Sequence, residues 1–149
     1  MGETFSKFFS QAGDSRIIVA TFSSNIHRIQ QIIDEAVHCG RKVAVSGRSM
    51  INVVSVASEL GYLNVPDNVL VDIDMIKNYP ANEMVIVTTG SQGEPMSALH
   101  RIAFSEHRQV EIIPGDMIII SANPIPGNEK LVNKVINELM KRGANVVYE

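Results

Sequence analysis

Short apolar runs alternate with longer amphipathic segments along this chain, and this alternation constrains the fold more than any other feature of the sequence. The apolar runs, rich in Val and Ile as expected for strands buried on both faces of a sheet, lie at 16–22, 41–45, 84–88 and 117–121. The amphipathic segments have the apolar spacing typical of helices, and they lie at 26–39, 50–60, 95–103 and 129–142. Strands that alternate with helices predict parallel pairing through helical crossovers. We therefore expect an α/β fold with a three-layer, mostly parallel, doubly wound sheet and helices on both faces.

Weaker signals predict the remaining elements. A helix over 1–12 places three phenylalanines on one face. A short strand at 69–71 precedes one or two helical turns over 72–79, and a final strand is expected at 145–148. Residues 109–113 are expected to form an edge strand of the sheet.

Composition limits the class of protein. A chain of 149 residues is expected to form one domain over 1–149, and its 45% hydrophobic residues with no tryptophan suit an aliphatic core. The formal net charge of -3 argues against a domain that holds nucleic acid by general electrostatics, although a local basic patch is compatible with it. The single Cys39 excludes an internal disulfide and a cysteine metal cluster. With no apolar run long enough for a signal peptide or a membrane span, we expect a cytoplasmic protein without membrane contact.

Polar loops follow the predicted strands, and parallel strands bring their carboxyl ends to one edge of the sheet, where ligands bind. The loops lie at 21–25, 46–49, 88–94 and 121–128. In the third loop, two glycines precede a helix that we expect to open with Pro95, since proline is preorganised for the first helical position. In the second, Arg48 stands between Gly47 and Ser49, so a guanidinium, a hydroxyl and backbone N–H groups would converge on a phosphate. The alternative is that both loops are ordinary strand-to-helix connections.

Spacing excludes several common chemistries. The chain contains neither the G-x-G-x-x-G string of dinucleotide-binding folds nor the G-x-x-x-x-G-K string of P-loop NTPases. No serine lies in a G-x-S-x-G nucleophile elbow, so Ser46, Ser91 and Ser121 are interpreted as capping or turn residues. The histidines form no local metal motif, since His27 and His38 on one predicted helix would lie about 16 Å apart along its axis.

Five strings spread over the chain carry its most specific signal: T-F-S-S-N-I-H-R at 21–28, G-R-K-V-A-V-S-G-R-S-M at 40–50, T-G-S-Q-G-E-P-M-S-A-L at 89–99, H-R-Q-V at 107–110 and P-I-P-G-N at 124–128. Together and in this order they closely resemble the β-CASP domain of bacterial ribonuclease J. The resemblance implies a Rossmann-like domain that is inserted into a metallo-β-lactamase domain carrying two zinc ions and that forms one wall of an RNA channel. It also implies a parent enzyme, expected to be a homo-oligomer, that acts as a 5′-to-3′ exonuclease and endonuclease in RNA decay and rRNA processing. In such an enzyme zinc-activated water would attack the phosphodiester.

The same resemblance assigns contacts to RNA or phosphate to seven loop residues: Asn25, Arg28, Arg48, Ser49, Ser91, Gln92 and Gly93. The family's metal-binding H-x-H-x-D-H string is missing from the sequence. The chain is therefore expected to be a domain excised from a larger enzyme, with no catalytic residue, metal ligand or cofactor of its own and no cleavage activity alone. Its expected partners are single-stranded RNA and the metallo-β-lactamase domain of the same longer chain. The alternative is a stand-alone α/β domain that binds a nucleotide or a sugar phosphate.

Overall fold

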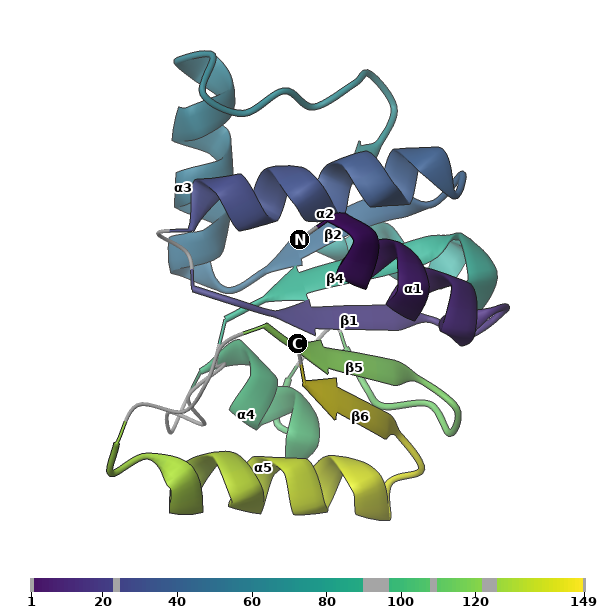
Figure 1. Ribbon diagram of the computed structural model, residues 1–149, viewed down its shortest axis with the longest axis vertical. Helices are drawn as coiled ribbons and strands as arrows, with labels where there is room; N and C mark the ends of the chain where they lie inside the picture. The colour runs from purple at the N-terminus through teal and green to yellow at the C-terminus, as the bar shows by residue number, and fades with distance from the viewer. Residues whose placement is uncertain (1, 23–24, 90–96, 108–109, 122–125, 149) are drawn as a thin grey trace.

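A computed structural model describes residues 2–22, 25–89, 97–107, 110–121 and 126–148, and it shows a six-stranded sheet between two layers of helices (Figure 1). The strands are β1 (Ile17–Ala20), β2 (Lys42–Ser46), β3 (Leu70–Val71), β4 (Met84–Thr88), β5 (Met117–Ile120) and β6 (Asn145–Tyr148). The α-helices are α1 (Gly2–Ala12), α2 (Ile26–His38), α3 (Arg48–Glu59), α4 (Ala98–Ala103) and α5 (Glu129–Lys141). Two 3₁₀ helices, η1 (Ile73–Asn78) and η2 (Ala81–Glu83), connect β3 to β4.

All pairings in this sheet are parallel, and the strand order is β3-β2-β4-β1-β5-β6. The chain leaves β1 through α2 toward β2, and it leaves β4 through α4 toward β5, with α2 and α4 on opposite faces of the sheet. The carboxyl ends of β1 and β4 therefore border a topological switch point, where open α/β sheets bind ligands. The expected three-layer, doubly wound architecture is confirmed.

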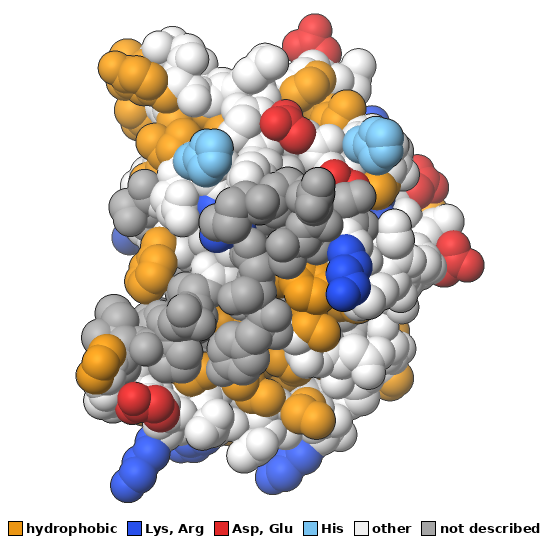
Figure 2. Space-filling model, viewed as in Figure 1, with side chains coloured by type: hydrophobic (Ala, Val, Ile, Leu, Met, Phe, Trp, Pro, Cys, Tyr) orange, Lys and Arg blue, Asp and Glu red, His pale blue; other side chains and the backbone are white. Residues whose placement is uncertain are grey.

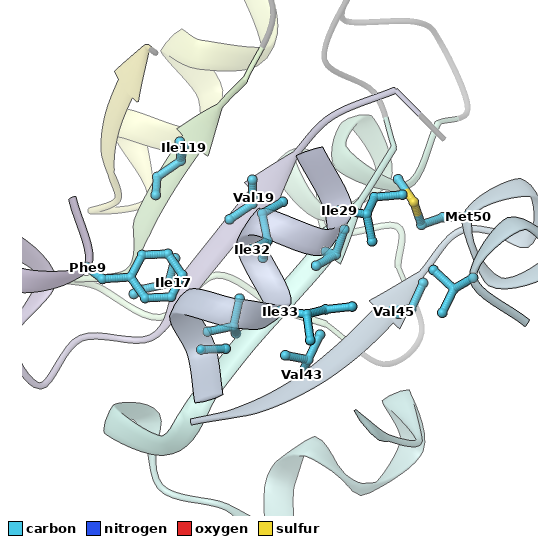
Figure 3. Close-up of a cluster of buried hydrophobic side chains, with 14 of the residues drawn as sticks. Phe9, Ile17, Val19, Ile29, Ile32, Ile33, Val43, Val45, Met50 and Ile119 are labelled. Atoms are coloured by element: carbon cyan, nitrogen blue, oxygen red, sulfur yellow. The ribbon is translucent and has the colours of Figure 1, made fainter. Parts of the chain in front are cut away.

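The first of two apolar cores lies between the sheet and the helices α1, α2 and α3. Alternate residues of a strand point to one face, so Ile17 and Val19 of β1 both enter this core. Figure 3 shows Phe9 of α1, Ile32 of α2 and Met50 of α3 among the side chains that meet there. This core fixes the three helices that follow or precede β1 and β2.

The second core lies on the opposite face, where Ile18, Ile86 and Ile118 of the central strands pack against α4, α5 and η1. β1, β4 and β5 are buried on both faces, and their side chains are apolar except for Thr88 at the end of β4, as the sequence indicated.

Arg41, only 4% exposed, holds the amino ends of the strands together. Its guanidinium donates to four backbone carbonyl oxygens at 2.7–3.3 Å, those of Gly13, Ser15, Ala81 and Met84. Three segments that are far apart in the sequence are therefore joined at one point by a buried cation whose N–H groups are used by the backbone.

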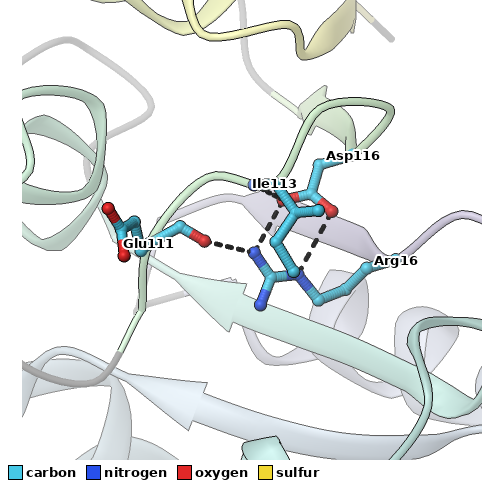
Figure 4. Close-up of polar contacts among 4 residues, drawn as sticks. All are labelled: Arg16, Glu111, Ile113 and Asp116. Atoms are coloured by element: carbon cyan, nitrogen blue, oxygen red, sulfur yellow. Dashed lines mark hydrogen bonds and ion pairs between the residues drawn. The ribbon is translucent and has the colours of Figure 1, made fainter.

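Arg16 makes a second buried connection at the same edge of the sheet (Figure 4). Its Nη2 lies 2.6 Å from Asp116 Oδ2 and donates to the Glu111 carbonyl at 2.6 Å, while its Nε donates to Asp116 Oδ1 at 3.3 Å. Asp116 Oδ2 also accepts the N–H of Ile113 at 2.9 Å. The segment before β5 is thereby tied to the start of β1.

Two sequence-based expectations are wrong. Residues 110–113 form no strand, and the part of 109–113 before them lies outside the described residues. The backbone of this segment bonds to the side chains of Arg16 and Asp116 instead of to a neighbouring strand. The helix expected to open with Pro95 begins at Ala98, because Ser97 is its N-cap and accepts the N–H of His100 at 3.3 Å.

Candidate functional site

Four buried hydroxyl residues end or directly follow the four central strands of the sheet: Thr21, Ser46, Thr88 and Ser121, all at most 5% exposed. Ser46 and Thr88 are register partners. The N–H of Thr21 donates to the Thr88 carbonyl at 3.1 Å, and the N–H of Ser121 donates to the Ala20 carbonyl at 2.9 Å. The polar loops expected at the carboxyl edge of the sheet therefore start side by side.

Gly47 makes the turn from β2 into α3 and needs to be glycine for two reasons. Its φ of +103° is a conformation that L residues rarely adopt. A Cβ at this position would also lie 2.9 Å from Thr89 Oγ1 and 3.6 Å from the Cβ of Ala98. The residues on both sides of the loop between β4 and α4 thus pack against the start of α3.

The first turn of α3 has no side-chain cap, because its N-cap is Gly47. The N–H of Ile51 closes the first helical bond to the Gly47 carbonyl at 2.9 Å, which leaves the preceding N–H groups of the turn without intrahelical acceptors. Arg48 and Ser49 are exposed at this end. Within the described residues the Arg48 guanidinium forms neither an ion pair nor a hydrogen bond. A helix dipole, N–H donors and an unpaired cation therefore coincide.

Asn25 and Arg28 stand at the start of α2, beyond the carboxyl end of β1. Asn25 is the N-cap, and its Oδ1 accepts the N–H of Arg28 at 3.1 Å. The amide oxygen of Asn25 is therefore already used by the protein. Arg28 is partly buried and engaged in interactions of its own.

Ser91, Gln92 and Gly93 lie outside the described residues. The described residues next to their loop are held in place, since the Leu99 N–H donates to the Thr89 carbonyl at 3.1 Å. The assignment of these three residues to RNA contacts stays a prediction.

His107 forms a contact at this edge that sequence reasoning did not identify. Its Nε2 lies 2.7 Å from Ser46 Oγ, and its Nδ1 accepts the N–H of Val110 at 3.1 Å. A nitrogen that accepts an N–H carries no proton, so the hydrogen of the neutral ring is on Nε2 and is donated to Ser46 Oγ. Because Ser46 precedes His107 by 61 positions and lies on another element, no local spacing could have indicated the pair.

The protonation state of His107 decides what this pair can do. Burial lowers the pKa of His107, and the nearby charge of Arg101 lowers it further, so the neutral ring is favoured at pH 7. A ring that donates to Ser46 cannot remove the proton of that hydroxyl, so the pair is not arranged as a nucleophile and its base. This geometry agrees with the interpretation of Ser46 as a structural residue.

Thr21 leaves one polar atom unsatisfied at the centre of the edge. Its Oγ1 is buried and has no hydrogen-bond partner in the described part of the chain. Such a group costs about 1–3 kcal/mol, which an added donor or acceptor at this position would recover.

The described residues include no group of three or more His, Cys, Asp or Glu side chains placed to hold a metal ion. They therefore do not fit the zinc ions that the family resemblance implies. Among the described residues no helix is long and apolar enough to cross a membrane.

Comparison with known proteins identifies a family over most of the chain. The family model described as ribonuclease J, β-CASP domain, matches residues 14–139. The chain is 49% identical over 145 residues to ribonuclease J of Helicobacter pylori strain J99, an alignment that covers 97% of this chain and 21% of the relative. It is 52% identical over 133 residues to ribonuclease J of Thermus thermophilus, with 89% of this chain and 23% of the relative covered. The chain thus spans about a fifth to a quarter of the length of these relatives.

Proposed function

This chain belongs to the β-CASP domain family of ribonuclease J, and from that premise we propose that it is the RNA-binding part of a longer ribonuclease. The longer protein would be a zinc-dependent 5′-to-3′ exonuclease and endonuclease of RNA processing and decay, at work in the cytoplasm. Zinc would activate the attacking water there. Its ligands would come from the metallo-β-lactamase domain of the same protein, since the described residues supply no ligand cluster.

The start of α3 is the observation that carries the RNA-binding proposal. The uncapped first turn offers backbone N–H groups, and the exposed Arg48 has no partner among the described residues. A phosphate of RNA supplies both the acceptor oxygens and the negative charge that this turn lacks. We assign Arg48 the charge-assisted bond to the phosphate, and Ser49 a hydroxyl contact beside it.

The other assigned residues extend the same surface around the switch point. Asn25 and Arg28 lie at the start of α2, and Ser91, Gln92 and Gly93 belong to the loop that follows β4. The alternative, a stand-alone domain for a nucleotide or sugar phosphate, would use the same turn. The family and the much greater length of the relatives favour RNA.

Fluorescence anisotropy with a labelled single-stranded oligoribonucleotide tests the proposal directly. Arg48→Ala should weaken binding by about 1.5–3 kcal/mol, roughly 10- to 150-fold, if the guanidinium makes a charge-assisted bond to a phosphate. Lys141→Ala is the matched control, because Lys141 is an exposed cation at the carboxyl end of α5. Equal losses for the two variants would show that binding follows net charge and not this turn.

The salt dependence of binding sharpens the same measurement. A domain with net charge -3 should release few counterions and bind RNA weakly. Loss of one phosphate contact in Arg48→Ala should lower the slope of log affinity against log salt by about 0.7 for a single strand. Nanomolar affinity at physiological salt would contradict this expectation and indicate a larger basic surface.

A further inference from the structure

A cavity of about 480 Å³ lies on the face of the sheet that α4 and α5 cover. Its walls come from η1, from the residues that lead to β4, and from residues 105–107 and 110–113. The volume is within the range of about 300–1,000 Å³ that is typical of small-molecule sites. None of the described residues assigned to RNA contacts lines this cavity. It is therefore large enough for a small molecule and separate from the start of α3.

Arg16 contributes a buried hydrogen-bond donor to the cavity. The residue is only 7% exposed, and its Nε and Nη2 are used by Asp116 and by the Glu111 carbonyl. Its Nη1 has no hydrogen-bond partner in the described part of the chain, yet it is not sealed from solvent. Figure 4 shows this nitrogen as the end of the guanidinium that no dashed line meets. An acceptor that enters the cavity would satisfy a donor that the protein leaves unused.

Lys77 and Tyr79 add two polar groups to the same cavity. Lys77 is exposed on η1, and its ammonium group forms no ion pair or hydrogen bond within the described residues. The hydroxyl of the partly buried Tyr79 likewise has no hydrogen bond there. His107 also lines the cavity, but its two ring nitrogens already contact Ser46 and Val110. The groups that a ligand could use are therefore donors, and the ligand must supply acceptors.

The charges around the cavity suit a ligand with a single negative charge. Asp116, 2.6 Å away, balances the charge of Arg16, so Lys77 supplies the unbalanced positive charge. Glu111 also lines the cavity, but Figure 4 shows its carboxylate pointing away from the Arg16 guanidinium. A phosphate monoester carries a charge of about -1.5 to -2 at pH 7, which exceeds what one lysine balances.

The exposed cations elsewhere offer no comparable arrangement on the face that Figure 2 shows. Among the described residues on that face, the Lys and Arg side chains stand apart from one another. A small ligand that bonds to two cationic groups at once therefore finds both in the cavity and not on that face.

The remaining walls of the cavity are apolar. Ile76, Met84 and Val110 are each at most 5% exposed, and Ile113 at the rim is 50% exposed. Such walls favour an apolar ligand body, and the thioether of Met84 makes favourable contacts with an aromatic ring. A buried donor, a cation and apolar walls are thus combined in one cavity.

We propose that this cavity binds a small organic carboxylate with an apolar body. The carboxylate accepts hydrogen bonds from Arg16 Nη1 and from the ammonium group of Lys77. The apolar body lies against Ile76, Met84 and Val110. The site is additional to the proposed RNA surface and does not depend on it.

An amide chemical-shift titration of the purified chain with naphthalene-2-carboxylate or octanoate tests the proposal at about pH 7.5, where carboxylates are ionised. The amides of Arg16, Lys77, Tyr79 and Ile113 should shift together. A ligand of this size should bind with a dissociation constant of about 1 mM or lower. Naphthalene-2-carboxamide has the same shape without the charge and should bind at least about tenfold more weakly.

Substitutions identify the groups that hold the carboxylate. Lys77→Ala should weaken binding by about two- to fivefold, the range of an exposed ion pair. Lys130→Ala is the matched control, because Lys130 is an exposed lysine of α5 that does not line the cavity, and it should change nothing. Arg16→Lys removes Nη1 and should weaken binding by about tenfold.

A charge test at Ile113 leaves Arg16 and its bonds to Asp116 in place. Ile113→Asp puts a negative charge at the rim and should weaken binding by about two- to fivefold. Ile113→Lys removes the same apolar side chain and should not weaken it. Equal losses for the two variants would show that the apolar side chain and not the charge matters, which contradicts a carboxylate at this place.

Three further outcomes overturn the proposal. The first is that neither carboxylate shifts these amides up to about 10 mM, a weaker affinity than such a site should have. The second is tighter binding of 2-naphthyl phosphate than of naphthalene-2-carboxylate, which would make this a phosphate site. The third is displacement of naphthalene-2-carboxylate by a single-stranded oligoribonucleotide, which would make the cavity part of the RNA surface.

Discussion

The two ends of the same sheet use arginine in opposite ways. At the amino ends of the strands, Arg41 and Arg16 are buried, and backbone carbonyls or Asp116 accept their hydrogen bonds. At the carboxyl ends, Arg48 lies at an uncapped helix start, is exposed and lacks a partner among the described residues. At the same edge the buried hydroxyl of Thr21 has no hydrogen-bond partner among the described residues.

The buried arginines at the amino ends of the strands contribute to stability, whereas the exposed Arg48 at the carboxyl ends is available for binding. A buried guanidinium with acceptors on several segments lowers the free energy of the folded state, and removing it leaves those acceptors without a donor. An exposed guanidinium without a partner adds little to stability and can bond to a ligand at no cost to the fold. Substitutions of the arginines at the two ends should therefore give opposite results in unfolding and binding experiments.

The largest effect is expected from Arg41→Met. The substitution leaves four carbonyl oxygens at the amino edge without their donor, so the free energy of unfolding should fall by about 3–5 kcal/mol. Urea denaturation followed by circular dichroism measures this change. Arg41→Lys keeps the charge but has fewer donors, so it should recover only part of the loss. A cost below about 1 kcal/mol for Arg41→Met would show that water replaces the guanidinium without penalty.

A smaller loss of stability is expected from Gly47→Ala at the carboxyl edge. The new Cβ would meet both a positive φ and the Thr89 hydroxyl, so we expect a cost of about 2–3 kcal/mol. Gly61→Ala is the control, because Gly61 has φ +81° with open space around it, and it should cost about 1 kcal/mol. Only Gly47→Ala should also weaken RNA binding. Identical costs for both variants would exclude crowding by Thr89.

The next effect depends on pH and on His107. Because burial and Arg101 lower the pKa of His107 in the folded protein, the unfolded chain binds a proton more readily at this position. The contribution of His107 is therefore complete above its unfolded pKa of about 6.5 and declines as pH falls below that value toward the lower folded pKa. The difference in stability between the wild type and His107→Gln should shrink between pH 7.5 and pH 5.5 in urea titrations. A difference that stays constant over this interval would contradict the assignment.

The smallest change in stability is expected from Arg48→Ala. Because its guanidinium has no partner among the described residues, the free energy of unfolding should change by less than about 0.5 kcal/mol. The same variant should lose RNA affinity by at least about tenfold. Paired unfolding and anisotropy measurements on one preparation check both statements. If stability fell together with affinity, the contrast between the two ends of the sheet would not hold.

Strand positions could be predicted because they depend on local composition. The buried strands β1, β4 and β5 match the predicted apolar runs, and α2 begins at Ile26 as expected, whereas α3 begins at Arg48, two residues before its expected start. The start of α4 was placed wrongly because proline is only one of the residues that favour a helix start, and Ser97 caps this helix instead. The strand expected at 109–113 failed because Arg16 and Asp116, both outside the segment, bond to its backbone.

Long-range polar contacts could not be predicted. Arg16 and Arg41 were interpreted as the first residues of strands, and nothing in their neighbours indicates that carbonyls up to 95 positions away surround them. The pairing of Ser46 with His107 likewise depends on the path of α4 across the sheet. In the candidate site, Arg48, Ser49, Asn25 and Arg28 were found at the predicted edge because each directly follows a strand or starts a helix there.

The strand order has a consequence for how this chain is made. In the described sheet β1 pairs with β4 and β5, whereas β2, the next strand to be synthesised, pairs with β3 and β4. While Met84–Thr88 is still inside the ribosome, the nascent chain already contains β1 and β2, but the strand that pairs with both of them, β4, is missing. Cooperative folding must wait for that late central strand, and such non-local closure is slow. A fragment that ends before Met84 should accordingly show no cooperative unfolding transition by circular dichroism, although it contains more than half of the residues.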